Sequence, residues 1–260
     1  MTYASIRYDL SDNIATITLN RPERMNALTP KLFVEFIDAL KAAQAGGARA
    51  LVLTGEGSAF CSGADLVGDG EGMPDDLGEL LESYYHPAIR EMAALDIPIV
   101  TAINGPAVGA GLSLALAGDC VLMARSSYLL LAFANIGLVP DAGATWLVAK
   151  SVGRAKALEM ALLGEKISAE QALGIGLVTR VIDDAQVMID ARAIATKLAN
   201  GPSIALGMIR KQVASALNST YAEMLEIEQF NQTKAGHTAD FREAVTAFAE
   251  KRKPVFKDAL

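Results

Sequence analysis

Residues 104–120 (NGPAVGAGLSLALAGDC) place the narrowest limits on how this chain can fold. A short apolar run, residues 97–103, precedes them and predicts a buried strand that Pro98 and Gly105 bound. Glycines and small residues then lead into a segment compatible with a helix. The first N–H groups of a helix have no partner within it, so this turn could bind a phosphate, a carboxylate or an oxyanion.

The glycines of this stretch do not match the common nucleotide-binding motifs. No Lys-Ser/Thr pair follows them, and their spacing does not fit G-x-G-x-x-G. The same residues are also consistent with a buried helix in which glycine and alanine only permit close packing. The sequence therefore leaves anion binding and close packing open.

A second turn of small residues, 59–66 (AFCSGADL), also follows a predicted strand. Free N–H groups at Ala64 and Ala110 would together form an oxyanion hole, which stabilises the enolate formed when a proton leaves the carbon beside a carbonyl. An enolate mechanism also needs a base. Asp141, directly after Pro140, is the best carboxylate candidate, and the alternative is that it caps a helix running to Ala149.

The remaining pattern predicts one layered α/β core followed by helices. Residues 3–10 and 13–19 form a predicted opening hairpin, and Thr29 with Pro30 is predicted to begin a helix. The acidic, glycine-containing segment 65–82 suits a mobile lid or a solvated loop. From residue 184 onward the pattern is helical almost throughout.

Composition excludes several classes of function. The net charge of −7 disfavours non-specific nucleic-acid binding, and no apolar stretch is long enough to cross a membrane. Cys61 and Cys120 lack metal-ligand spacing and do not suggest a disulfide framework, so we expect no metal and a reducing cytoplasm. The two histidines, His86 and His237, are interpreted as surface or interface residues, and Trp146 as a core residue.

Several segments in order resemble the crotonase, or enoyl-CoA hydratase/isomerase, superfamily. They are residues 19–22 (LNRP), 59–66, 104–120, 137–145 and 248–253 (FAEKRK), and the resemblance spans nearly the whole chain. It implies the α/β crotonase (ClpP-like) fold, a spiral of β-β-α units over residues 1–195, and a C-terminal helical trimerisation region over residues 196–260. It also implies an acyl-CoA substrate, no separate cofactor because CoA is part of the substrate, and a homotrimer or a dimer of trimers.

The resemblance also implies roles for particular residues. Ala64 and Ala110 would supply the oxyanion donors, and Asp141 occupies the position where isomerase branches carry a single acid/base. Arg24 would lie near the CoA phosphates, and Phe248 and Lys251 near the nucleotide of a CoA bound to a neighbouring subunit. The residues implied to contact the substrate are Arg24, Ala64, Asp65, Leu66, Gly109, Ser113, Phe133, Phe248 and Lys251.

Two departures from the family pattern indicate the reaction. Hydratases of the family use two glutamates to activate water, and here Ser113 and Phe133 stand at those positions. Residues 132–141 are similar to the epoxyphenylacetyl-CoA isomerase branch. We therefore predict an isomerase that moves a double bond, or rearranges an epoxide, beside a CoA thioester. The alternatives are a hydratase or hydrolase that uses a carboxylate of residues 65–82, and a catalytically silent acyl-CoA-binding protein.

Overall fold

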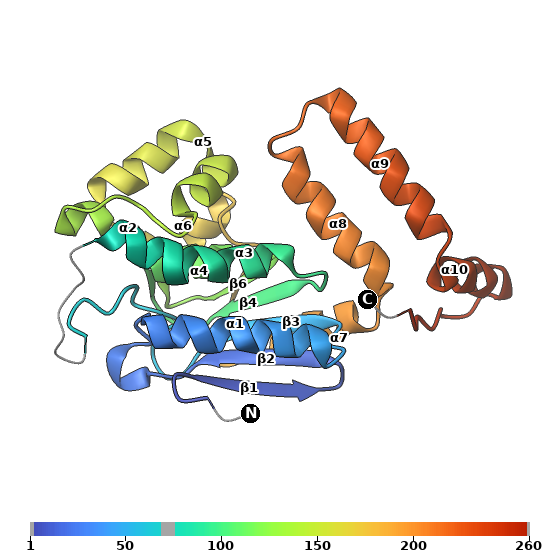
Figure 1. Cartoon of the computed structure of the whole chain (residues 1–260), viewed down its shortest axis with the longest axis horizontal. Helices are drawn as coiled ribbons and strands as arrows, with labels where there is room; N and C mark the ends of the chain where they lie inside the picture. Colours follow the sequence, from blue (N-terminus) through green and yellow to red (C-terminus); the bar gives the residue numbers. More distant parts are fainter. Residues whose placement is uncertain (1–2, 69–75, 259–260) are drawn as a thin grey trace.

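A six-stranded sheet lies at the centre of the computed structural model, which describes residues 3–68 and 76–258 (Figure 1). Its strands, in spatial order, are β1 (Ile6–Ser11), β2 (Ile14–Leu19), β3 (Ala50–Gly55), β4 (Ile99–Ile103), β6 (Cys120–Ala124) and β9 (Arg180–Ile182). The first pair is antiparallel and every other neighbouring pair is parallel. The predicted hairpin is confirmed, with positive φ at Asp12 (54°) and Asn13 (59°), as a type I′ turn requires.

Helices cover both faces of this sheet because its strands bury alternate residues on opposite sides. Leu51 and Leu53 of β3 belong to the larger core cluster, which α1 (Pro30–Ala45) and α3 (His86–Ala94) help to form. Ala50 and Val52 of the same strand pack instead against α7 (Val187–Ala199). The predicted start of α1 is confirmed, since the Thr29 side chain accepts a hydrogen bond from the N–H of Leu32.

A small second sheet positions the glycine-rich stretch. Its strands are β5 (Ala107–Val108), β7 (Tyr128–Leu130) and β8 (Ile167–Ser168). Helix α4 (Ala110–Leu116) begins two residues after β5, and every one of its residues is buried. The close-packed helix that the sequence left open as one alternative is therefore present, and the turn before it follows a strand of the small sheet.

The helix expected to start at Asp141 begins three residues later. Helix α5 spans Ala144–Leu163, is interrupted at Gly153, and has Gly143 rather than Asp141 at its N-cap. Ala142 and Gly143 have φ of 47° and 85°, and this left-handed backbone cannot continue into the first helical turn. The alternative that the Asp141 side chain caps this helix is therefore wrong.

The last three helices, α8 (Ser203–Ala216), α9 (Tyr221–Gly236) and α10 (Ala239–Glu250), project away from the central sheet (Figure 1). The predicted division at residues 195 and 196 lies within α7, which packs on the sheet, and the division itself stays a prediction. The proposed lid, residues 65–82, lies partly outside the described residues.

Shorter helical segments are α2 (Leu77–Leu80), the π-helical turn Leu81–Tyr85, α6 (Ala169–Gly174) and the 3-10 turns Pro22–Arg24, Ala132–Ile136 and Asp184–Gln186.

Candidate active site

A cavity of about 530 Å³ collects many of the residues singled out in the sequence. It is bordered by the turn before α4, the turn at Ala64, the segment after the Ala132–Ile136 turn and the start of α3. Most of its lining is hydrocarbon or aromatic. The predicted site residues that line it are Ala64, Leu66, Gly109, Ala110, Phe133 and Asp141.

The two small-residue turns are in direct contact inside this cavity. A Cβ atom added to Gly63 would lie 2.9 Å from the carbonyl oxygen of Val108 and 3.7 Å from the amide nitrogen of Ala110. Gly63 has φ of 93° and Gly109 has φ of 54°, conformations that residues with a Cβ rarely adopt. Glycine is therefore required at both positions for the chain to bring Ala64 and Ala110 together.

Hydrogen bonding leaves the N–H groups of Ala64 and Ala110 available. Leu28 pairs with the residues on either side of Ala64: its N–H donates to the Gly63 carbonyl and its carbonyl accepts from the N–H of Asp65. In such parallel pairing the N–H and C=O groups of Ala64 itself point away from Leu28. Ala110 is the first residue of α4, so its N–H has no partner in the helix. In the described part of the chain neither N–H donates to a protein acceptor.

Asp141 lines the same cavity with an unsatisfied carboxylate. Its Oδ1 atom is buried without a hydrogen-bond partner among the described residues. Burial raises the pKa of the Asp141 carboxyl to about 6 because the charged form loses contact with water. A carboxyl group with this pKa is partly ionised near neutral pH and can both accept and return a proton.

Ser113 holds the Asp141 loop rather than lining the cavity. Its side chain is fully buried, and its Oγ donates a hydrogen bond of 3.1 Å to the backbone carbonyl of Asp141. The N–H of Ala144 donates to the same carbonyl at 2.9 Å. The backbone of Asp141 is therefore fixed by two donors while its side chain stays free for other contacts.

Asp65 and Arg24 lie beside the cavity without lining it. Asp65 forms a largely buried ion pair with Arg21 at 2.8 Å, so its side chain faces Arg21 rather than the predicted acyl group. Burial raises the pKa of Asp65, but hydrogen bonds from Arg21 and Gly68 outweigh it and leave the pKa below its usual value. Arg24 is exposed, and its guanidinium donates to the carbonyl of Gly68 at 3.4 Å.

Phe248 and Lys251 lie on α10 and at its end, outside the set of residues that line the cavity. Phe248 is 86% exposed and Lys251 ends the helix with φ of 56°. In Figure 1, α10 lies at the opposite end of the molecule from α2 and α5, which border the cavity. The structure of one chain therefore does not bring these two residues to the candidate site.

The geometry agrees with the comparison with known families. A family model described as enoyl-CoA hydratase/isomerase matches residues 9–259. The chain belongs to this family. The predicted crotonase fold is confirmed by solved structures, because an enoyl-CoA hydratase from Bacillus anthracis superposes with a TM-score of 0.93 at 31% identity, covering 98% of this chain and 99% of that one.

Relatives within the enoyl-CoA hydratase/isomerase family carry two kinds of name. A protein of Rhodobacter capsulatus described as "Probable enoyl-CoA hydratase" is 45% identical, covering 98% of this chain and 99% of the relative. The 1,2-epoxyphenylacetyl-CoA isomerase of Escherichia coli is 42% identical, covering 94% of each chain. Both similarities extend over nearly the full length, so the choice between hydration and isomerisation depends on the site residues.

The sequence interpretation missed several residues of this family member's cavity. Tyr85 and His86 line it, and so does Trp146, which was expected in the core but is 38% exposed. A detectable signal existed, because Leu77, Leu81 and Tyr85 recur every four residues and therefore share one face of a helix. All three of these residues line the cavity.

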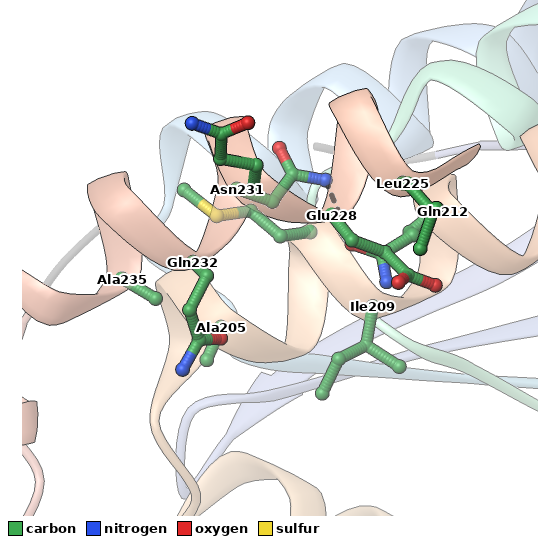
Figure 2. Close-up of a pocket in the computed structure, with 10 residues that line it drawn as sticks. Ala205, Ile209, Gln212, Leu225, Glu228, Asn231, Gln232 and Ala235 are labelled. Carbon is green, nitrogen blue, oxygen red and sulfur yellow. Dashed lines mark hydrogen bonds between the residues drawn. The ribbon is translucent and has the colours of Figure 1, made fainter. Parts of the chain in front are cut away.

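A second cavity, of about 580 Å³, lies between α8 and α9 and has a different character (Figure 2). Its lining combines apolar side chains with amides, and Asn231 donates to Gln212 at 2.9 Å. Glu228 is the one ionisable residue in that lining, and no pair of free backbone donors faces it among the described residues. This cavity therefore lacks the combination of acid and oxyanion donors seen at Asp141.

Residues 3–68 and 76–258 include no cluster of three or more histidine, cysteine or acidic residues suited to a metal ion. Among the helices that can be described, none combines the length and apolar character that a membrane crossing needs.

Proposed function

We propose that this enzyme is an acyl-CoA isomerase that moves a double bond, or rearranges an epoxide, beside the CoA thioester. The observation that carries the proposal is that Asp141 supplies the one carboxylate among the described residues lining the cavity. Moving a double bond needs one group that takes a proton from one carbon and returns it to another. Asp141, with its raised pKa and unsatisfied Oδ1, suits that exchange.

In the proposed mechanism the thioester oxygen accepts hydrogen bonds from the N–H groups of Ala64 and Ala110. The ionised Asp141 removes a proton from a carbon of the acyl group, and the electron pair moves onto the thioester oxygen to form the enolate. The two N–H groups stabilise that charge, each by about 3 kcal/mol. Protonated Asp141 then returns the proton to a different carbon as the enolate collapses, so no water is consumed.

Hydration is the main competing reaction, and the name of the Rhodobacter capsulatus relative supports it. Against it, the positions that carry glutamates in family hydratases hold Ser113, whose hydroxyl is engaged with Asp141, and the phenyl ring of Phe133. No second carboxylate of the described residues lines the cavity to orient a water molecule.

Turnover of enoyl-CoA esters in water enriched in heavy oxygen separates these reactions. An isomerase is expected to give a product of unchanged mass with a shifted double bond, measured by mass spectrometry and NMR. Incorporation of the heavy isotope into the acyl product would contradict the proposal and support hydration. Tight binding of the esters with no product at all would indicate a catalytically silent acyl-CoA-binding protein.

The pH dependence of the reaction provides a second test of the proton carrier. The kcat/KM of the enzyme is expected to rise with pH through about 6 and then level off, because only the ionised Asp141 accepts a proton. Steady-state rates across this range with one enoyl-CoA substrate would measure it. A rising limb near pH 4, about the usual pKa of an exposed aspartate, would show that another carboxylate is the base.

We also propose that the chain assembles as a homotrimer or a dimer of trimers. The three C-terminal helices expose large apolar side chains, which in a globular protein often mark an interface: Ile209, Val213, Leu225, Phe230, Phe241, Val245 and Phe248. Assembly would bring Phe248 and Lys251 to the CoA of a neighbouring subunit, with Arg24 near the phosphates. Sedimentation equilibrium is expected to give a mass of three or six chains, and a monomer would contradict the proposal.

A further inference from the structure

Tyr85 is the most deeply buried polar side chain of the candidate active site that the proposed mechanism does not use. It is 2% exposed and lines the cavity. Its ring packs against Phe33 with a centroid distance of 4.3 Å, and it is the last residue of the π-helical turn Leu81–Tyr85. Such turns are rare and are found frequently at functional sites. The ring is therefore held firmly and its hydroxyl is directed by the fold.

The hydroxyl of Tyr85 has no hydrogen-bond partner among the described residues and, unlike the Oδ1 of Asp141, it is not fully enclosed by protein atoms. The phenolic hydroxyl groups of buried tyrosines usually find a partner, and a residue that lines a cavity can take that partner from a bound molecule. The same cavity contains the unpartnered Oδ1 of Asp141. Two unsatisfied polar groups in one largely apolar cavity indicate that a bound molecule supplies the missing partners.

The charge state of Tyr85 limits what that partner can be. Burial raises the pKa of the Tyr85 phenol, and the negative charges of Asp141, Cys61 and Asp65 raise it further. The phenol therefore stays protonated near neutral pH and acts as a hydrogen-bond donor rather than a base. Its partner must be an acceptor, and the thioester oxygen is already assigned to the N–H groups of Ala64 and Ala110.

The neighbouring polar side chains of the cavity are not both almost fully buried and without a hydrogen-bond partner. His86 is half-buried and Thr145 is exposed, so water can satisfy them. Ser62 donates its hydroxyl hydrogen to the carbonyl of Arg24. Tyr85 is thus the one side-chain donor in the described lining that is both almost fully buried and unpaired.

We propose that the Tyr85 hydroxyl donates a hydrogen bond to a second oxygen, carried by the acyl group itself. The chemical class of substrate is then an acyl-CoA whose acyl part contains an ether, epoxide, hydroxyl or ketone oxygen, in preference to a plain hydrocarbon chain. This inference rests on the proposed binding of acyl-CoA in this cavity, and it does not depend on which reaction follows.

The test compares matched ligands that cannot react. Hexanoyl-CoA is paired with analogues in which each methylene of the acyl chain beyond the one next to the carbonyl is replaced in turn by an ether oxygen, and dissociation constants are measured by calorimetry. Tyr85→Phe removes the hydroxyl while keeping the ring on Phe33. Tyr84→Phe is the matched control, because it makes the same change one residue earlier at a side chain that does not line the cavity.

Tyr85→Phe is expected to lose affinity for an ether analogue and not for hexanoyl-CoA. For at least one ether position, Tyr85→Phe is expected to bind the ether analogue about five- to tenfold more weakly than the wild type, as loss of one hydrogen bond implies. Its affinity for hexanoyl-CoA is expected to stay unchanged, and Tyr84→Phe is expected to match the wild type for every ligand. Thermal melting of both variants checks that the fold is intact.

Two other outcomes have distinct meanings. If hexanoyl-CoA binds and the ratio of ether to hydrocarbon affinity is the same in Tyr85→Phe and the wild type at every position, the role of Tyr85 is overturned while the proposed function stands. If no acyl-CoA binds the wild-type protein, the proposed function fails first and the inference fails with it.

Discussion

Replacing Asp141 with Asn is expected to lower the isomerase kcat about 10³-fold or more, the upper part of the range for loss of a general acid/base. The amide has nearly the same shape as the carboxylate but cannot take up and return a proton. Binding of the CoA ester is expected to change little, because the Oδ1 atom of Asp141 bonds to no other residue in the described part of the chain. Steady-state kinetics together with calorimetric binding separate the two effects.

Glu82→Gln is the matched control for this variant. Glu82 belongs to the acidic segment that would supply the acid in a hydratase or hydrolase, and its side chain is exposed outside the cavity. Its kcat is expected to equal that of the wild type. Full activity in Asp141→Asn, or loss of activity in Glu82→Gln, would transfer the role of acid to residues 65–82.

The pH dependence of stability offers an independent check on the burial of the Asp141 carboxyl group. Its folded-state pKa of about 6 lies above the ordinary value of 3.8, so folding favours the protonated form. The stabilising contribution of that form is complete below about pH 4 and is lost as the pH rises through about 6. Asn has no charge to bury, so Asp141→Asn is expected to melt at a higher temperature than the wild type at about pH 8. Equal melting temperatures there would show that the carboxylate is better solvated than the structure indicates.

Gly63→Ala is expected to reduce kcat about 10²- to 10³-fold, the range measured elsewhere for loss of one oxyanion donor. The new Cβ would lie 2.9 Å from the carbonyl oxygen of Val108, so the turn that carries Ala64 must shift away from the turn that carries Ala110. The φ of 93° at Gly63 adds backbone strain. Kinetics with one enoyl-CoA, alongside thermal melting, measures both consequences.

Gly47→Ala is the control that separates the effect of backbone strain from that of the close contact at Gly63. Gly47 has φ of 76°, but a Cβ added there meets no atom within 4 Å. This variant is expected to lose about 1 kcal/mol of unfolding free energy and no activity, because a side chain in a left-handed conformation costs about that much. Equal kcat in Gly63→Ala and the wild type would show that the spacing of the two turns does not matter to the reaction.

Local chemistry explains which parts of the fold were predictable. The opening hairpin depends on a turn at Asp12 and Asn13, and the start of α1 depends on the Thr29 cap, so each is encoded within a few residues. The helix after Pro140 was misplaced because its start depends on the left-handed backbone at Ala142 and Gly143. Residues with a Cβ rarely adopt that conformation, so local propensity gave no sign of it.

The backbone donors of the candidate site were the part that local sequence made easiest to predict. Ala64 and Ala110 could be proposed from glycine-containing turns, and the contact at Gly63 is the kind that such turns permit. The burial of Asp141 and the ion pair of Asp65 with Arg21 depend on segments distant in sequence. Such long-range contacts leave little local signal, so the sequence could name Asp141 as a candidate but could not show that its carboxyl group is buried.

The hydrogen bond from Ser113 to Asp141 has a consequence for how such an enzyme could change its chemistry. Introducing a glutamate at position 113 would add a group typical of water addition, but it would also remove the hydroxyl that holds the backbone of Asp141, the proposed proton carrier. Position 113 therefore cannot both carry that glutamate and hold the Asp141 backbone through the serine hydroxyl.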